Sequence, residues 1–370
     1  MRVLITGGAG FIGGHLVDRF LADGFRVRVL DSLNPKIHPD GKPQWLSPEA
    51  EFIQGDVTDR ETLLEALQGV DIVSHQAAYQ DYMPDFSRFI DVNATGTALL
   101  YELIVEKKLG VKKVIVASSQ AVYGEGQYEC PQHGFLLPMP RSISQLQASI
   151  WAVQCPRCGR DCQPRLLQEE HNNPYNQYAV SKLAEEKVAL GLGWLHGIPT
   201  VSLRYSITQG PRQSLFNHYS GICRIFVSRA MRGEPLIIYE DGKQTRDFVH
   251  IQDVVDANML VLRDRSADFQ AFNVGSGHSV SVLEYAQAVR SKIGRDVDFQ
   301  ISGEYRRGDN RHSVSSVEKL CTLGWQPRRN LSTILDDFVT WIHEIGGIPD
   351  KIADAYTQMK NAGVVLSAAR

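Results

Sequence analysis

The first 31 residues limit the fold of this chain more than any other stretch does. A short aliphatic run at 3–5 leads into a glycine-rich segment at 6–13 (TGGAGFIG), a helical pattern, and a second apolar run that ends on Asp31. This order predicts a strand, a tight turn, a helix and a second strand. Glycines at three-residue intervals suit a turn whose backbone approaches a pyrophosphate and whose helix packs closely on the sheet. We therefore predict that the chain opens with a dinucleotide-binding turn.

The acid at the end of the second strand indicates which dinucleotide is bound. The carboxylate of Asp31 would accept hydrogen bonds from an adenosine ribose and would repel a 2′-phosphate, so NAD is favoured over NADP. A tight strand-to-helix turn without a ligand is the alternative, but it does not explain the acid. The cofactor contacts that we expect from this segment are Gly7, Gly10, Phe11, Ile12 and Asp31, with Gly13 allowing close packing of the helix.

Composition restricts the partners and the compartment. The chain has 370 residues, 43% of them hydrophobic and 22% charged, which is ordinary for a protein with a sizeable core. A net charge of −3 gives no reason to expect nucleic acid or an anionic membrane as a partner. We see no membrane-spanning run and no signal peptide, so we expect a cytoplasmic protein. Its six cysteines would then stay reduced, and clustered ones would suggest a metal.

Alternating apolar runs and helical patterns predict a Rossmann-type α/β fold with a doubly wound parallel sheet. Ligands should then bind at the carboxyl ends of the strands. The alternation is interrupted between about 124 and 168. Strands are expected at 3–5, 27–30, 51–55, 70–74, 113–117, 200–204, 236–239 and 272–274, and helices at 60–67, 86–108, 178–195, 222–232, from 252, at 282–293 and at 331–345.

We expect three parts. The NAD-binding domain would span 1–204, interrupted by a cysteine-rich insertion at 125–168. A smaller substrate-binding region, partly interleaved with the sheet, would span 205–345, and 346–370 would form a weakly helical or frayed tail.

One helix carries a pair of residues suited to acid–base chemistry. Tyr178 and Lys182 are four residues apart and share a face of the helix. A nearby cation favours the phenolate of a tyrosine, whose ordinary pKa of about 10 makes it a poor base at neutral pH. Such a pair arises often by chance, but Ser119 follows the strand at 113–117 and Asn93 lies inside the helix at 86–108.

The glycine turn, Asn93, Ser119 and the Tyr178–Lys182 motif, in this order, resemble the extended short-chain dehydrogenase/reductase family, specifically its nucleotide-sugar epimerases and dehydratases. The resemblance covers 1–345 apart from the interruption. It implies that Tyr178 is the catalytic base, that Lys182 holds the nicotinamide ribose, and that Ser119 hydrogen-bonds the reacting oxygen. The further cofactor contacts that it implies are Asp56, Val57, Ala77, Ala78 and Asn93.

The positions after Ser119 exclude one branch of this family. The 4,6-dehydratases place an Asp-Glu pair there, whereas this chain has Gln120 and Ala121. An amide and a methyl group cannot transfer protons, so dehydration is excluded, and Gln120 is instead expected to contact the substrate.

Two arginines resemble the family's diphosphate contacts. Arg246 opens the segment 246–254, and Arg306 opens 306–309. Two guanidinium groups on one diphosphate would give charge-assisted, bidentate recognition; a surface ion pair is the alternative for each. One departure is Ile207, which replaces the family's usual asparagine and removes a substrate hydrogen bond.

The insertion contains two short metal-binding motifs. Cys130-Pro131-Gln132-His133 and Cys155-Pro156-Arg157-Cys158-Gly159 have the spacing of a zinc ribbon. We predict a structural zinc held by Cys130, His133, Cys155 and Cys158, and Cys162 could replace His133. A loop of reduced cysteines and a catalytic zinc are the alternatives.

The sequence therefore predicts an NAD-dependent nucleoside-diphosphate-sugar 4-epimerase that works through a 4-keto sugar. The insertion, together with a late segment at 308–312 (GDNRH), resembles dTDP-L-rhamnose 4-epimerases, which form dTDP-6-deoxy-L-talose. UDP-glucose or UDP-glucuronate 4-epimerase is the alternative, while a deoxysugar-forming reductase or an epimerase at another carbon remains open. A non-catalytic NAD sensor with a zinc interaction module belongs to another class, and the intact Ser119, Tyr178 and Lys182 argue against it. The resemblance also implies a homodimer through the helices at 86–108 and 178–195.

Overall fold

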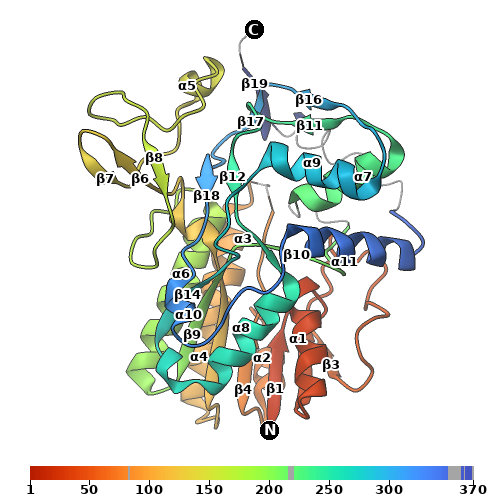
Figure 1. The fold of residues 1–370 in the computed structure, drawn as a ribbon. Coiled ribbons are helices and arrows are strands. Elements are labelled where there is room, and N and C mark those ends of the chain that lie inside the picture. Colours follow the sequence, from red (N-terminus) through yellow and green to blue (C-terminus); the bar gives the residue numbers. More distant parts are fainter. Residues whose placement is uncertain (82–83, 216–220, 349–359, 362, 369–370) are drawn as a thin grey trace.

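The core of the molecule is a seven-stranded parallel sheet with the order β3-β2-β1-β4-β5-β9-β14 (Figure 1). The computed structural model describes residues 1–81, 84–215, 221–348, 360–361 and 363–368. The sequence order of the strands reverses between β1 and β4, which is where ligands bind in such folds. The predicted doubly wound parallel sheet is confirmed. Its strands are β1 (Arg2–Thr6), β2 (Arg26–Asp31), β3 (Glu51–Gln54), β4 (Ile72–His75), β5 (Lys113–Ser119), β9 (Thr200–Tyr205) and β14 (Gln270–Val274).

Apolar side chains on both faces of the central strands explain why helices cover the sheet on both sides. In β1, Leu4 belongs to the core cluster on one face, whereas Val3 and Ile5 belong to the cluster on the other. This is the alternation that a strand imposes on successive side chains. The first face is covered by α2 (Arg60–Leu67), α4 (Gly96–Glu106) and α6 (Gln177–His196), and the second by α1 (Phe11–Ala22) and α8 (Ile251–Arg263).

The predicted long helix at 86–108 is divided in three. It begins as α3 (Phe86–Phe89), widens into a π-helical stretch at Ile90–Thr95, and continues as α4. Asn93 lies in the π-helical stretch and is fully buried. Such widened turns are frequent at functional sites.

The later part of the chain builds a second core above the carboxyl ends of the strands (Figure 1). It comprises α7 (Gly221–Arg232), α9 (Val282–Ile293), α11 (Leu331–Glu344), β11 (Leu236–Ile238) and β16 (Phe299–Ile301). Because α8 and β14 come from this part yet belong to the main layers, the two parts are interleaved. This part of the chain also contains short strands that sequence periodicity does not reveal, because each has only two or three residues. They are β10 (Ile207–Gln209), β13 (Phe248–His250), β12 (Thr245–Arg246), β15 (Val280–Ser281), β17 (Glu304–Arg306) and β18 (His312–Ser313).

The insertion and the C-terminus both contain short strands. The insertion forms a small antiparallel sheet of β7 (Gly134–Leu136), β6 (Gln127–Cys130) and β8 (Gln163–Arg165), and α5 (Ile143–Gln147) lies between β7 and β8 in the sequence. The prediction of a weakly helical or frayed tail is wrong for β19 (Val365–Ser367), which pairs with β17, and residues 349–359 lie outside the described part. In the described part of the chain, no helix combines the length and the apolarity that crossing a bilayer requires.

Candidate active site

The glycine turn forms a cradle that any side chain would fill. Gly7 has φ of 68°, and a Cβ there would lie 2.8 Å from the backbone nitrogen of Ala77. A Cβ on Gly13 would lie 2.2 Å from the carbonyl oxygen of Gly7. Gly10 is the N-cap of helix α1 and provides no side-chain cap, so the first N–H groups of the helix are left for a ligand at the turn. These features suit a pyrophosphate at the helix start.

The carboxylate of Asp31 is held in place at the end of β2. Its Oδ2 accepts the N–H of Ala9 at 3.0 Å and its Oδ1 accepts the N–H of Leu33 at 2.9 Å. Each carboxylate oxygen can accept a further bond, as a ribose diol requires. The other predicted cofactor contacts follow β3 and β4 at the same edge of the sheet, and the residues present therefore fit NAD. These contacts are Asp56, Val57, Ala77 and Ala78.

Three predicted catalytic residues lie together at the start of α6. Asn176 caps this helix by accepting the N–H of Ala179 at 2.8 Å, and Tyr178 and Lys182 follow on its buried face. Ser119 ends β5 and hydrogen-bonds the Tyr178 hydroxyl. Burial raises the pKa of Tyr178, while the Lys182 charge and the Ser119 hydrogen bond lower it. The chain therefore holds a phenol whose deprotonation depends on these two neighbours.

Sequence reasoning missed Glu185, which is fully buried beside Lys182. Its carboxylate forms an ion pair with the Lys182 ammonium one turn earlier in the helix. Burial raises the pKa of Glu185 to about 7, and the Lys182 charge opposes this rise. An acid three positions after a catalytic lysine shares its helix face, and this spacing could have identified the pair.

The amides of Asn93 and Gln120 are engaged with protein groups. Asn93 accepts the N–H of Tyr79 at 2.7 Å, and its own N–H groups donate to the carbonyl of Tyr79 and to Ser181. These bonds fix α6 against the π-helical stretch, and the cofactor contact of Asn93 stays a prediction. The N–H groups of Gln120 donate to Ser206 at 3.1 Å and to Ser315 at 2.8 Å, so its amide is fixed from two sides.

The two predicted diphosphate arginines lie in short strands of two different sheets. In β12, Arg246 donates to the carboxylate of Asp309 at 3.0 Å and to the carbonyl oxygens of Asn310 and Arg311 at 2.8 and 3.1 Å. This is the ion pair that was the alternative for Arg246, although its side chain is only 12% exposed, and the diphosphate contact stays a prediction. In β17, the half-buried Arg306 lies with its guanidinium over the ring of Tyr239 at 5.3 Å. Ile207 packs against the second core, as an apolar side chain would.

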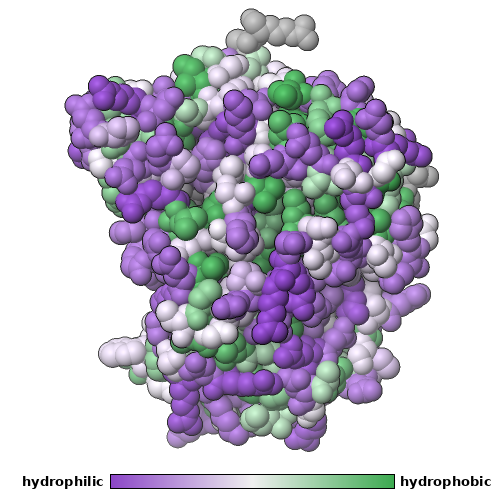
Figure 2. Space-filling view, in the orientation of Figure 1, coloured by the Kyte–Doolittle hydropathy of each residue, from purple (hydrophilic) through white to green (hydrophobic). Residues whose placement is uncertain are grey.

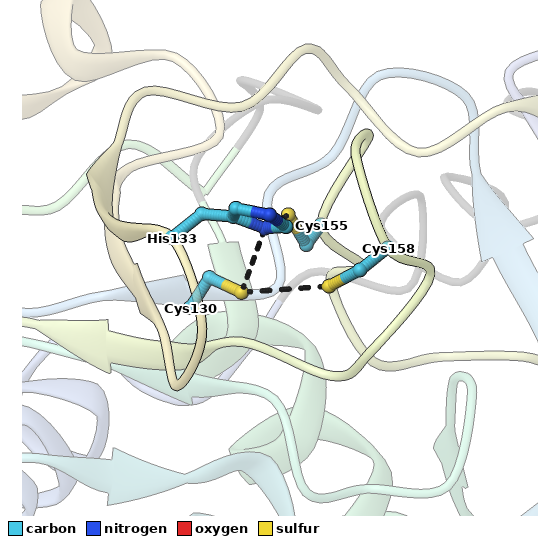
Figure 3. Close-up of side chains that lie close together, drawn as sticks. All are labelled: Cys130, His133, Cys155 and Cys158. Atoms are coloured by element: carbon cyan, nitrogen blue, oxygen red, sulfur yellow. Dashed lines mark hydrogen bonds between the residues drawn. The ribbon is translucent and has the colours of Figure 1, made fainter.

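The insertion brings four predicted metal ligands into one cluster (Figure 3). The sulfur of Cys130 lies 3.7 Å from Nδ1 of His133 and 3.7 Å from the sulfur of Cys158, and His133 Nδ1 lies 3.3 Å from the sulfur of Cys155. A tetrahedron with Zn–S bonds of ~2.3 Å has edges of about 3.8 Å, so the donor set fits zinc. Cys162 is buried beside these residues, with its sulfur 3.8 Å from the carbonyl of Arg160.

Comparison with known proteins agrees with this geometry. A model of the NAD dependent epimerase/dehydratase family matches residues 3–143 and 158–275, well over half of the chain. The chain belongs to this family. The residues between the two matched segments fall within the insertion, so the family's shared part does not include that stretch.

Relatives in this family cover almost the whole chain. The dTDP-L-rhamnose 4-epimerase of Burkholderia thailandensis is 34% identical over 349 residues, which are 92% of this chain and 94% of that protein. The UDP-glucose 4-epimerase of Lacticaseibacillus casei is 30% identical over 365 residues, 93% of this chain and 97% of that protein. The UDP-glucose 4-epimerase of Thermus thermophilus, solved in complex with NAD, superposes with a TM-score of 0.71 at 30% identity and covers 93% of this chain and 99% of its own.

Proposed function

We propose that this protein is an NAD-dependent nucleoside-diphosphate-sugar 4-epimerase whose substrate is dTDP-L-rhamnose and whose product is dTDP-6-deoxy-L-talose. The observation that carries this proposal is the buried Tyr178, which hydrogen-bonds Ser119 and feels the charge of Lys182, in a chain whose glycine turn fits NAD. Gln120 and Ala121 supply no acid for dehydration. The 34% identity to a dTDP-L-rhamnose 4-epimerase supports the choice of sugar.

Each residue of the site would have a separate role in the reaction. Tyr178 would accept the proton of the C4 hydroxyl and later return it, since a positioned base contributes to such a transfer. Ser119 would donate a hydrogen bond to the same oxygen, and Lys182 would hold the phenolate form. When bound at the glycine turn, NAD supplies a hydride acceptor that can also give the hydride back. Arg246 and Arg306 would hold the diphosphate while the 4-keto sugar turns to present its other face.

The substrate is tested by incubating the purified protein with dTDP-L-rhamnose, UDP-glucose and UDP-glucuronate in parallel, without added reductant. We expect conversion of dTDP-L-rhamnose to its C4 epimer at the highest kcat/KM of the three. Preference for a UDP-sugar would favour the alternative substrate, which the L. casei and T. thermophilus relatives support. No conversion of any of the three would contradict the proposed activity.

We also propose that Cys130, His133, Cys155 and Cys158 hold a structural zinc ion. The insertion has a small core of its own, in which Tyr128 and Val153 pack mainly against cysteines. Its outer surface, at the upper left of Figure 2, is largely hydrophilic. A metal would supply folding energy that such a small apolar cluster does not.

Replacing a ligand should remove the metal. We expect wild-type protein to contain one zinc ion per chain, and Cys155→Ser to lose it and to unfold at a lower temperature, as measured by elemental analysis and thermal denaturation. Cys321→Ser is the matched control, because Cys321 lies outside the cluster, in α10 (Glu318–Cys321). Wild-type protein that is purified intact and free of metal would refute the zinc site.

A homodimer is proposed on the basis of apolar residues that α3, the π-helical stretch, α4 and α6 expose. Helices α4 and α6 pack side by side (Figure 1). Solvent-exposed apolar side chains on this bundle include Phe86 at 60%, Val105 at 38%, Trp194 at 72% and Leu195 at 65% exposure. Apolar groups of this size on adjacent helices favour association with a second copy.

A charge among these exposed apolar residues should dissociate the dimer. Trp194→Glu is expected to shift the protein from dimer to monomer in sedimentation velocity, because it buries an unpaired carboxylate in the interface. Ile301→Glu, at another exposed apolar position in β16, should leave the dimer intact. A monomeric wild-type protein would contradict the proposal.

A further inference from the structure

A buried arginine of the insertion contacts the substrate-binding region. Arg141 precedes α5, and its side chain is 2% exposed. Its guanidinium makes a bidentate pair with the carboxylate of Glu240, at 2.9 and 3.0 Å, and also donates to the carbonyl oxygen of Asp309 at 2.9 Å. A long side chain is thus fixed in one geometry by groups far away in the sequence.

The hydrogen bond to Asp309 connects Arg141 to Arg246, the first predicted diphosphate arginine. Arg246 is held by the carboxylate of Asp309 and by the carbonyl oxygens of Asn310 and Arg311. The segment 309–311 is itself fixed from the insertion side, since Arg141 holds the carbonyl of Asp309 and the carboxylate of Glu125 accepts the N–H of Arg311 at 2.6 Å. The position of Arg246 therefore depends on Arg141 through one intervening residue.

The ion pair with Glu240 connects Arg141 to Arg306, the second predicted diphosphate arginine. Glu240 has φ of 52°, a conformation that is uncommon for residues with a side chain, so it needs support from its surroundings. Its carboxylate is shared between Arg141 and Arg311, which approach at 2.9 and 2.6 Å. The residue before it, Tyr239, carries the ring over which the Arg306 guanidinium lies. Arg141 thus supports the turn on which Arg306 rests.

We propose that Arg141 is a positioning residue for diphosphate recognition, which fixes Arg246 through Asp309 and Arg306 through Glu240. The insertion is then a part of the substrate-binding apparatus, and this inference rests on the proposed nucleotide-sugar activity. Further contacts join the two parts, because Leu167 exchanges backbone hydrogen bonds with Val314 and Ser316, and the ring of Trp151 lies 6.3 Å from that of Tyr305. In Figure 1 the insertion accordingly lies beside β18.

Binding of dTDP and of UDP to the NAD-loaded protein, measured by titration calorimetry, tests this role without turnover. We expect Arg141→Met to weaken nucleoside-diphosphate binding about 10- to 100-fold, the loss typical when a partner that orients a ligand-binding group is removed. NAD and metal content should be unchanged. In turnover assays KM should rise with kcat preserved, as for lost uniform binding, and Arg141→Lys should recover part of the affinity. Arg165→Met is the matched control, because Arg165 makes an exposed ion pair with Glu129 in the same insertion.

The outcomes separate this inference from the proposed function. Wild-type affinity for both diphosphates in Arg141→Met would overturn the role of Arg141 alone. If that variant does not fold, Glu240→Gln is used instead, because it keeps the shape of the side chain and removes the shared charge. A selective loss of diphosphate affinity in this variant supports the inference, and unchanged affinity overturns it. Wild-type protein that binds neither dTDP nor UDP would overturn the proposed function and the inference with it.

Discussion

Tyr178→Phe is expected to lower the turnover number for epimerisation by roughly 10²- to 10⁴-fold, the range of a lost general base. The substitution removes only the hydroxyl from a side chain that is 9% exposed, so the fold and the NAD content should be preserved. Product formation is measured by chromatography of the nucleotide sugars, with bound NAD and melting temperature as controls. Turnover within a factor of a few of wild type would remove Tyr178 from the mechanism.

The pH profile of a second variant tests how Tyr178 is activated. The phenol acts as a base only when it is deprotonated, so activity should rise with pH through its pKa. Burial raises the pKa of Tyr178 and the Lys182 charge lowers it. Lys182→Met should therefore move the rising limb of kcat to higher pH. A limb that stays in place would show that the ammonium does not set the pKa of the base.

Gly13→Ala is expected to weaken NAD binding roughly 10- to 100-fold, corresponding to the ~1–3 kcal/mol cost of an overpacked methyl group. The new Cβ would lie 2.2 Å from the carbonyl oxygen of Gly7 and 2.8 Å from Cα of Gly8. These are backbone atoms of the cradle, which can yield only by opening the turn. The amount of NAD that co-purifies and the affinity of the stripped protein measure the effect.

A glycine in open space provides the control for this substitution. Gly110→Ala meets no atom within 4 Å, so its NAD content should match that of wild type. Full NAD occupancy in Gly13→Ala would contradict the assignment of this turn to the cofactor.

The sequence predicted those elements whose signals are local. The expected helices at 60–67 and 282–293 agree with α2 and α9, because each carries its own start signal: Asp59 caps the first, and Ser281 with Glu284 forms a capping box on the second. The parallel strands followed from apolar runs that are buried on both faces. The order of motifs placed Ser119, Tyr178 and Lys182 in one site.

Features that depend on distant partners could not be predicted. The π-helical stretch at Ile90–Thr95 accompanies bonds of Asn93 to Tyr79 and to Ser181, which is 88 residues away. Arg141 looks like any loop arginine until the fold brings Glu240, 99 residues later, against it. The strand β19 has little periodicity of its own and forms because β17 offers an open edge.

The central claim is that a hydride leaves C4 of the sugar and returns to the same carbon. It is tested most directly with a dTDP-L-rhamnose that carries deuterium at C4, incubated with the NAD-loaded protein in ordinary water without added reductant. The proposed mechanism predicts the C4 epimer with its deuterium still at C4, as read by mass spectrometry and proton NMR. An epimer that has exchanged the deuterium for solvent hydrogen, or the absence of any epimer from this substrate and from the UDP-sugars, would contradict it.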